Sequence, residues 1–122
     1  MKRHLIKLAI VIVAITPFIS HAKYFTNYNS AGVEITRIHN HSNGDVTLII
    51  SGTVDNLDEC AVTSRVHLKS NLVGHNQMVA SSMMAFASGK KIGLYASGCE
   101  IIPFWGSSGG LTPVITNLWV LK

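Results

Sequence analysis

The first 22 residues most constrain what this chain folds into, because they separate an export segment from the residues that build a domain. A basic start with Lys2, Arg3 and Lys7 is followed by an apolar run over residues 8–19 and then by Ser20-His21-Ala22. This order is typical of a secretory signal peptide, whose charges stay in the cytoplasm while small residues fit the signal peptidase. We therefore expect a signal peptide over residues 1–22 and a single domain over residues 23–122.

The alternative reading of this segment is a membrane anchor that stays attached. The apolar run over residues 8–19 is shorter than the ~20 residues that a helix needs to span a bilayer. We therefore expect a mature chain that begins at Lys23, has no stable membrane insertion, and is secreted or periplasmic through Gram-negative-type export.

Charge excludes one class of partner. The whole chain has a formal charge of +4, but three of its ten Lys and Arg residues lie in the expected signal peptide. The remaining seven face six Asp and Glu residues, so the mature net charge is +1. No basic patch remains that would drive binding to nucleic acid or to an anionic membrane, and we expect no nucleic-acid partner.

The two cysteines, Cys60 and Cys99, both lie in the expected mature chain. In a small exported domain, such a pair most often forms a disulfide. The closed loop of about 40 residues would stabilise the fold by about 4 kcal/mol. The alternatives are free thiols or a metal site, but zinc needs two more ligands and no Cys-x-x-Cys spacing occurs.

Alternation of apolar and polar residues predicts strands in the mature chain. Val33 and Ile35 alternate with Glu34 and Thr36, and Asn43-Gly44 is the strongest short signal for a hairpin. The predicted strands cover residues 31–38, 45–54, 60–69, 91–97 and 113–121. The last strand has apolar residues on both faces, which indicates that a partner subunit covers its outer side. Residues 23–30 are expected to form a short N-terminal arm.

One helix is predicted over residues 77–88, with Asn76 as its N-cap and Gly89 as its left-handed end. Its expected core stripe consists of Val79, Ala80, Met83, Phe86 and Ala87, which recur at helical spacing. The alternative to core packing is that Met78, Met83 and Met84 form a binding surface on this helix.

The resulting order is three strands, a helix and two strands. This is the order of a mainly β, five-stranded OB-fold-like barrel with one helix between strands 3 and 4. Local matches lie at residues 30–36 (SAGVEIT), at Ser88-Gly89-Lys90 and at Ile92-Gly93-Leu94-Tyr95. With these matches the chain resembles the B subunits of AB5 toxins, closest to the subtilase-cytotoxin and pertussis-like group.

The resemblance implies a ring-shaped homopentamer that binds sialylated glycans on host cells. In that family, a serine directly before the first-strand glycine and a tyrosine in the strand after the helix contact the sugar. Here Ala31 precedes Gly32 and Ser30 lies one residue further back, while the tyrosine position falls at Ala96 beside Tyr95. A shift of one residue in a strand turns a side chain to the other face.

No catalytic motif is present. The chain has no Gly-x-Ser-x-Gly, no His-Glu-x-x-His and no phosphate-binding loop between a strand and a helix. His39, His41, His67 and His75 lack a further ligand at fixed spacing, so we interpret them as surface histidines. We expect no enzyme activity, no cofactor and no metal.

Aromatic side chains are the remaining binding candidates, because sugar faces and protein interfaces both favour them. Phe104-Trp105 lies before a Gly/Ser run and is the clearest exposed aromatic pair. The predicted ligand-binding residues are Tyr28, Ser30, Tyr95, Phe104 and Trp105. We expect an exported, non-enzymatic, self-associating binding subunit that recognises a host glycan or an exported protein. The alternative is a monomeric periplasmic domain with a structural or inhibitory role.

Overall fold

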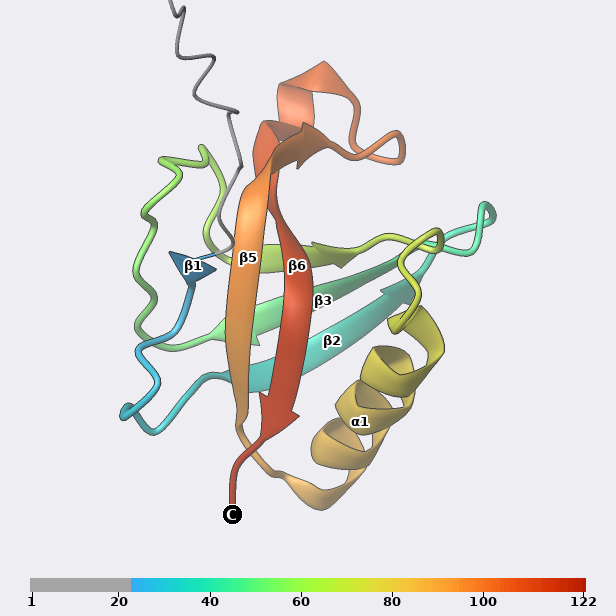
Figure 1. Cartoon of the computed structure of the whole chain (residues 1–122). Helices are drawn as coiled ribbons and strands as arrows, with labels where there is room; N and C mark the ends of the chain where they lie inside the picture. Colours follow the sequence, from blue (N-terminus) through green and yellow to red (C-terminus); the bar gives the residue numbers. More distant parts are fainter. Residues whose placement is uncertain (1–22) are drawn as a thin grey trace, which may run out of the picture.

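The computed structural model describes residues 23–122, which fold into a β-sheet with one α-helix packed at its side (Figure 1). The elements are β1 (Lys23–Tyr24), β2 (Glu34–Asn40), β3 (Val46–Ser51), β4 (Arg65–Leu68), α1 (His75–Ser88), β5 (Ile92–Ile101), a 3-10 turn (Ser107–Gly109) and β6 (Leu111–Val120). The prediction of a mainly β fold with one helix before the last two long strands is confirmed. The expected signal peptide lies outside the described residues.

The strands form a sheet in the order β1-β5-β6-β4-β3-β2. All neighbours are antiparallel except β4 and β6, which run parallel. Within residues 23–122 this six-stranded sheet is not closed, so the predicted barrel is not shown. A single isolated antiparallel bridge joins Val33, just before β2, to Ile92 of β5. In Figure 1, β5 and β6 run steeply across β2 and β3, and α1 packs against β2, β4 and β6.

The β2–β3 hairpin is confirmed. Gly44 has a φ of +89°, which a residue without a Cβ adopts at little cost. The Asn43 side chain accepts a hydrogen bond from the backbone of Asp45 at 3.0 Å. Val33 and Ile35 are buried, as the alternation predicts.

The β5–β6 hairpin is longer than predicted. The strand expected over residues 91–97 was to end before Gly98 and the last strand to begin at residue 113, but β5 continues to Ile101 and β6 already begins at Leu111. The register shifts between Ala96 and Cys99, where Gly98 has a φ of +73°. Gly98 therefore lies in a β-bulge, which bends a strand without ending it.

The predicted third strand was too long at its start. It was expected from Cys60, but β4 begins at Arg65, and residues 52–64 form a loop. The predicted disulfide is confirmed, because Cys60 is bonded to Cys99 with the Cα atoms 5.7 Å apart. Asn56 supports this link by accepting from the Cys60 N–H at 2.9 Å and donating to its carbonyl at 2.7 Å. The loop is therefore attached to β5 covalently.

The expected N-terminal arm is part of the fold. β1 pairs with β5, Phe25 and Thr26 are buried, and the Thr26 hydroxyl accepts a hydrogen bond from the Leu94 N–H at 2.9 Å. The N-terminal segment shows no alternation of apolar and polar residues, because only two of its residues, in β1, pair with the sheet.

The helix differs from its prediction at the start and in its buried face. It begins at His75 with Gly74 as its N-cap instead of Asn76, whereas its end at Ser88 and the left-handed Gly89 are confirmed. The buried stripe is His75, Met78, Ser82 and Ala85, while Met83, Met84 and Phe86 are exposed. Neither face carries a charge, so the sequence distinguishes them poorly. No helix in the described part of the chain is long and apolar enough to cross a membrane.

Candidate functional site

The structure places the five predicted ligand-binding residues in three separate regions. Tyr28 and Tyr95 lie on one aromatic surface, whereas Phe104 lines a groove with histidines and Trp105 lies beside it against the His39 ring. Ser30 belongs to neither region. Its hydroxyl donates to the Asn27 carbonyl at 2.7 Å and accepts from the Gly32 N–H at 3.2 Å, so it stabilises the turn before β2.

The first region is a surface of Tyr24, Tyr28, Tyr95, Asn117 and Trp119, which we call the tyrosine–tryptophan surface. The Tyr24 ring lies 4.7 Å from Tyr95, 5.9 Å from Tyr28 and 6.2 Å from Trp119 between centroids. Together the five residues line a shallow depression of about 250 Å³. Tyr28 is 64% exposed and Tyr24 is 45% exposed, so these rings are not core residues.

Strand geometry explains why these rings meet. Tyr24 pairs with Tyr95 across β1 and β5, and Tyr95 pairs with Asn117 across β5 and β6. Trp119 pairs with Gly93, and a Cβ at Gly93 would overlap the indole ring. The glycine therefore lets the Trp119 ring lie flat on the backbone of β5. Sequence reasoning identified two of the five residues but missed Tyr24, Asn117 and Trp119, because the β1–β5 pairing was not predicted.

The second region lies between the β2–β3 turn and the loop that follows β5, and we call it the histidine–aromatic groove. Its volume is about 560 Å³, and its lining includes His39, His41, Asn43, Asp45 and Phe104. The His39 ring lies 4.9 Å from Phe104, 5.2 Å from Trp105 and 5.5 Å from His41. The histidines were expected to be surface residues, but His67 and His75 are buried, and the fold brings His39, His41 and His67 together. The available signal was the spacing of His39 and His41, which points both to one side of a strand.

Phe104 and Trp105 are held differently. Phe104 is 65% exposed at the edge of the groove. Trp105 is half-buried beneath the Arg65 guanidinium, whose carbon lies 4.2 Å from the ring centroid. Arg65 also donates to Thr112 at 3.1 Å and to the Gly109 carbonyl. Burial lowers the pKa of Arg65. Phe104 is therefore the freer contact, while Trp105 anchors the loop.

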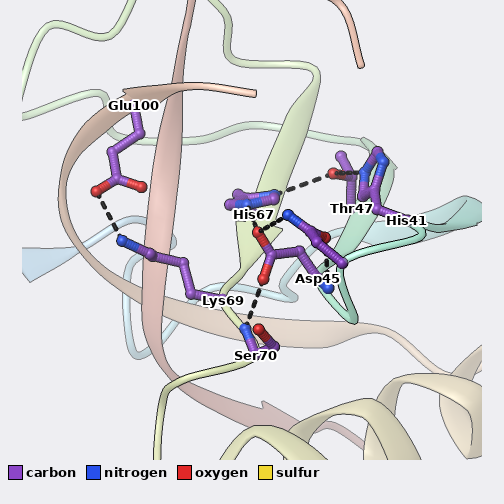
Figure 2. Close-up of polar contacts among 8 residues, drawn as sticks. His41, Asp45, Thr47, His67, Lys69, Ser70 and Glu100 are labelled. Atoms are coloured by element: carbon purple, nitrogen blue, oxygen red, sulfur yellow. Dashed lines mark hydrogen bonds and ion pairs between the residues drawn. The ribbon is translucent and has the colours of Figure 1, made fainter. Parts of the chain in front are cut away.

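A continuous chain of hydrogen bonds forms the wall of the groove (Figure 2). An Asp45 carboxylate oxygen lies 3.0 Å from His67 Nε2, and His67 Nδ1 lies 3.1 Å from the Thr47 hydroxyl. The same hydroxyl lies 2.7 Å from His41 Nε2. The second Asp45 oxygen accepts from the Ser70 N–H at 2.7 Å. His67 and Thr47 are buried, whereas His41 faces the groove.

The charge states of Asp45 and His41, the two ends of this hydrogen-bond chain, follow from their surroundings. Burial opposes ionisation of Asp45, but hydrogen bonds from Ser70 and His67 outweigh it and lower the Asp45 pKa. Burial lowers the pKa of His41, and the neighbouring His67 and His39 lower it further against the opposing effect of Asp45. Asp45 is therefore ionised and His41 neutral at neutral pH.

The hydroxyl in this hydrogen-bond chain is not accessible as a nucleophile. Asp45, His67 and Thr47 have the order of a catalytic triad, but the Thr47 side chain is fully buried beneath its neighbours. Among residues 23–122, no group of three or more His, Cys, Asp or Glu side chains is placed to hold a metal ion. The groove combines aromatic rings with a few polar groups, a lining that ligand-binding pockets often have.

Comparison with known proteins found no similar protein. No protein-family model, no curated protein and no solved structure matches this chain. The two regions are therefore interpreted from the chemistry of their own residues.

Proposed function

We propose that this protein is an exported, non-enzymatic binding subunit that recognises a glycan through the tyrosine–tryptophan surface. The observation that carries the proposal is the set of four aromatic rings, Tyr24, Tyr28, Tyr95 and Trp119, on one exposed face. Three of them are attached to paired strands, so little conformational entropy is lost when a ligand binds.

The chemistry of this surface suits a sugar. Flat rings offer apolar faces for the C–H side of a pyranose, while the phenol groups and the Asn117 amide offer donors and acceptors for hydroxyls. No Lys, Arg, Asp or Glu lines the depression among the described residues. A neutral part of a glycan therefore fits it better than a charged one.

The proposed fold family is the OB-fold, in line with the resemblance to AB5 toxin B subunits. Three consecutive antiparallel strands, β2 to β4, are followed by a helix and a hairpin whose β6 returns parallel to β4. The bridge between Val33 and Ile92 supports a nearly closed form of this topology. The Cys60–Cys99 disulfide supports a secreted or periplasmic location, because disulfides persist in oxidising compartments.

Self-association, with a pentamer as the expected form, is part of the same proposal. The exposed face of α1 carries Met83, Met84 and Phe86 and no charge, which suits burial against a second copy. The alternative is a monomeric periplasmic domain that acts on another exported protein. The native mass of the oxidised protein separates these two, because a pentamer has five times the monomer mass.

A glycan array probed with the oxidised, exported protein tests the proposed activity. Replacing Tyr28 with Ala removes an exposed ring and is expected to weaken glycan affinity about tenfold. Tyr28→Phe keeps the ring and shows how much the hydroxyl adds. Leu57→Ala, which shortens an exposed apolar side chain on the 52–64 loop, is the control and is expected to leave binding unchanged. Full glycan binding by the Tyr28→Ala variant would contradict the assignment of this surface.

A further inference from the structure

The positive charges that no other side chain holds gather at one end of the sheet. Residues 23–122 contain seven Lys and Arg side chains. Lys23 and Lys69 pair with acids, and Arg65 lies over the Trp105 ring. The remaining four make no ion pair or side-chain hydrogen bond within the described chain: Arg37, Lys90, Lys91 and Lys122.

Three of these four cations line one hollow. Lys90 and Lys91 follow the end of α1, and Lys122 follows β6, so two segments bring their charges to the same end of the fold (Figure 1). The hollow between them has a volume of about 550 Å³, and we call it the lysine hollow. No acidic side chain occurs in its described lining, whose other members are Ser30, Ala31, Ser88, Gly89 and Leu121.

Positive charge outweighs negative charge at this end of the fold. The last carbonyl groups of α1 carry roughly half a negative charge, and a main-chain carboxylate at Lys122 adds one more. Three ammonium groups exceed both together. The mature net charge of +1 averages over the chain, whereas the fold concentrates unpaired positive charge in this hollow.

Strand register connects the lysine hollow to the tyrosine–tryptophan surface. Trp119 pairs with Gly93 across β5 and β6. Two residues further along, the Leu121 N–H donates to the Lys91 carbonyl at 2.8 Å. Because alternate residues of a strand share a face and two residues span about 7 Å, Lys91 lies one step beyond the Trp119 ring on the same face.

The segment before β2 borders both surfaces. Tyr28 lines the aromatic depression, whereas Ser30 and Ala31 line the lysine hollow. A Cβ at Gly32 would overlap the Leu121 side chain, so this segment packs directly on the end of β6. The lysine hollow therefore adjoins the tyrosine–tryptophan surface, within reach of the next sugar of a glycan bound there.

The cations of the hollow define the kind of anion that fits. All three are lysines, which act as point charges, whereas an arginine would bind a carboxylate through its planar fork. A sulfate ester spreads its negative charge over three terminal oxygens, so separate ammonium groups can contact different oxygens. The ester also stays ionised over the whole physiological pH range.

We propose that the lysine hollow binds a sulfate ester on a glycan whose neutral sugar stacks on the tyrosine–tryptophan surface. The inference rests on the proposed function, because it assigns that glycan to the sulfated class. The aromatic rings contact the neutral sugar, and the lysines select the sulfate on the neighbouring one.

A glycan array tests this specificity when it carries the same oligosaccharides unmodified, with one sulfate ester and with a terminal sialic acid. For the oxidised protein we expect about tenfold tighter binding of a sulfated glycan than of its unmodified form. This gain should disappear in about 1 M NaCl, where the Debye length is about 3 Å. An equal gain from sialic acid overturns the assignment to sulfate, and no gain from sulfate overturns the anion site.

Glutamine variants locate the source of the gain. A triple variant, Lys90→Gln, Lys91→Gln and Lys122→Gln, removes charge from exposed side chains and is expected to abolish the gain while binding of the unmodified glycans stays the same. Arg37→Gln is the matched control, because it removes the fourth unpaired cation, which lies on β2 outside the hollow. A gain that survives the triple replacement, or that Arg37→Gln reduces equally, would refute the assignment.

Sodium sulfate is a probe that does not depend on the aromatic surface. In an NMR titration against NaCl at equal ionic strength, we expect saturable shifts of the amide signals of residues 89–91 and 121–122 and none at Tyr24, Tyr95 or Trp119. Absence of these shifts overturns the anion site and leaves the proposed function standing. Sulfate-dependent glycan binding that Tyr28→Ala leaves unchanged overturns the proposed function and leaves the anion site standing.

Discussion

Reduction of the Cys60–Cys99 disulfide is the perturbation whose effect can be worked out most directly. The bond joins residues 39 apart and closes a loop of about 40 residues. Loop-closure entropy for that length gives a loss of about 4 kcal/mol from the free energy of unfolding. A domain of this size has about 5–15 kcal/mol in total, so the loss takes a large share of it. The corresponding fall in melting temperature is about 20 °C.

The native fold itself should survive reduction. Asp58 still binds Lys23 at 2.7 Å and accepts from the Gly98 N–H at 2.9 Å, which keeps the 52–64 loop against β5. The effect is therefore expected in the unfolded state, which gains conformational freedom once the loop is open.

Urea unfolding of the oxidised and reduced protein measures this loss. A variant with Cys60→Ala and Cys99→Ala is the control. Its stability should match that of the reduced protein and should not change when reductant is added. A loss below about 1 kcal/mol would refute the reasoning, since it would mean that the reduced, unfolded chain stays nearly as restricted as the cross-linked one.

Three further predictions concern packing and charge. Gly93→Ala places a methyl group where the Trp119 ring lies, so we expect a loss of about 2 kcal/mol in chemical unfolding and a changed tryptophan emission spectrum; an unchanged spectrum would contradict the flat placement of the ring. Leu48→Ala empties a fully buried site on β3 and is expected to cost about 3 kcal/mol, and a cost under 1 kcal/mol would mean that this core position is not packed. The Lys23 ammonium and the Gly98 N–H hold the pKa of Asp58 below its usual value, so stability should be full above about pH 4 and fall below it. The Asp58→Asn variant should lose less stability below pH 4 than the wild-type protein. An equal loss in the two proteins would show that Asp58 does not cause it.

Much of the fold could be predicted from short stretches of sequence. The Asn43-Gly44 turn, the alternation around Val33 and the left-handed Gly89 all depend on residues within one or two turns of chain, and each is confirmed. The same local reasoning misread Gly98 as a strand end. A glycine with positive φ serves a turn and a bulge equally well, and only the register against β6 distinguishes them.

The candidate sites depended on contacts that no local pattern contains. Tyr24 reaches Tyr95 through an edge pairing of two residues, and His41 reaches His67 through Thr47 on the strand between them. Aromatic residues in the sequence indicated binding, but not which of them share a surface.

The sequence by itself determined the order of the five main strands and the helix, the first hairpin, the cysteine pair and the end of the helix, because turn chemistry and side-chain alternation act over a few residues. Only the tertiary structure decided which face of α1 is buried. Both faces are uncharged and partly apolar, so the choice of Met78 over Met83 came from packing against β2, β4 and β6. It also decided that Asp45, His67 and Thr47 form one chain, since hydrogen bonds between β3 and β4 depend on their register.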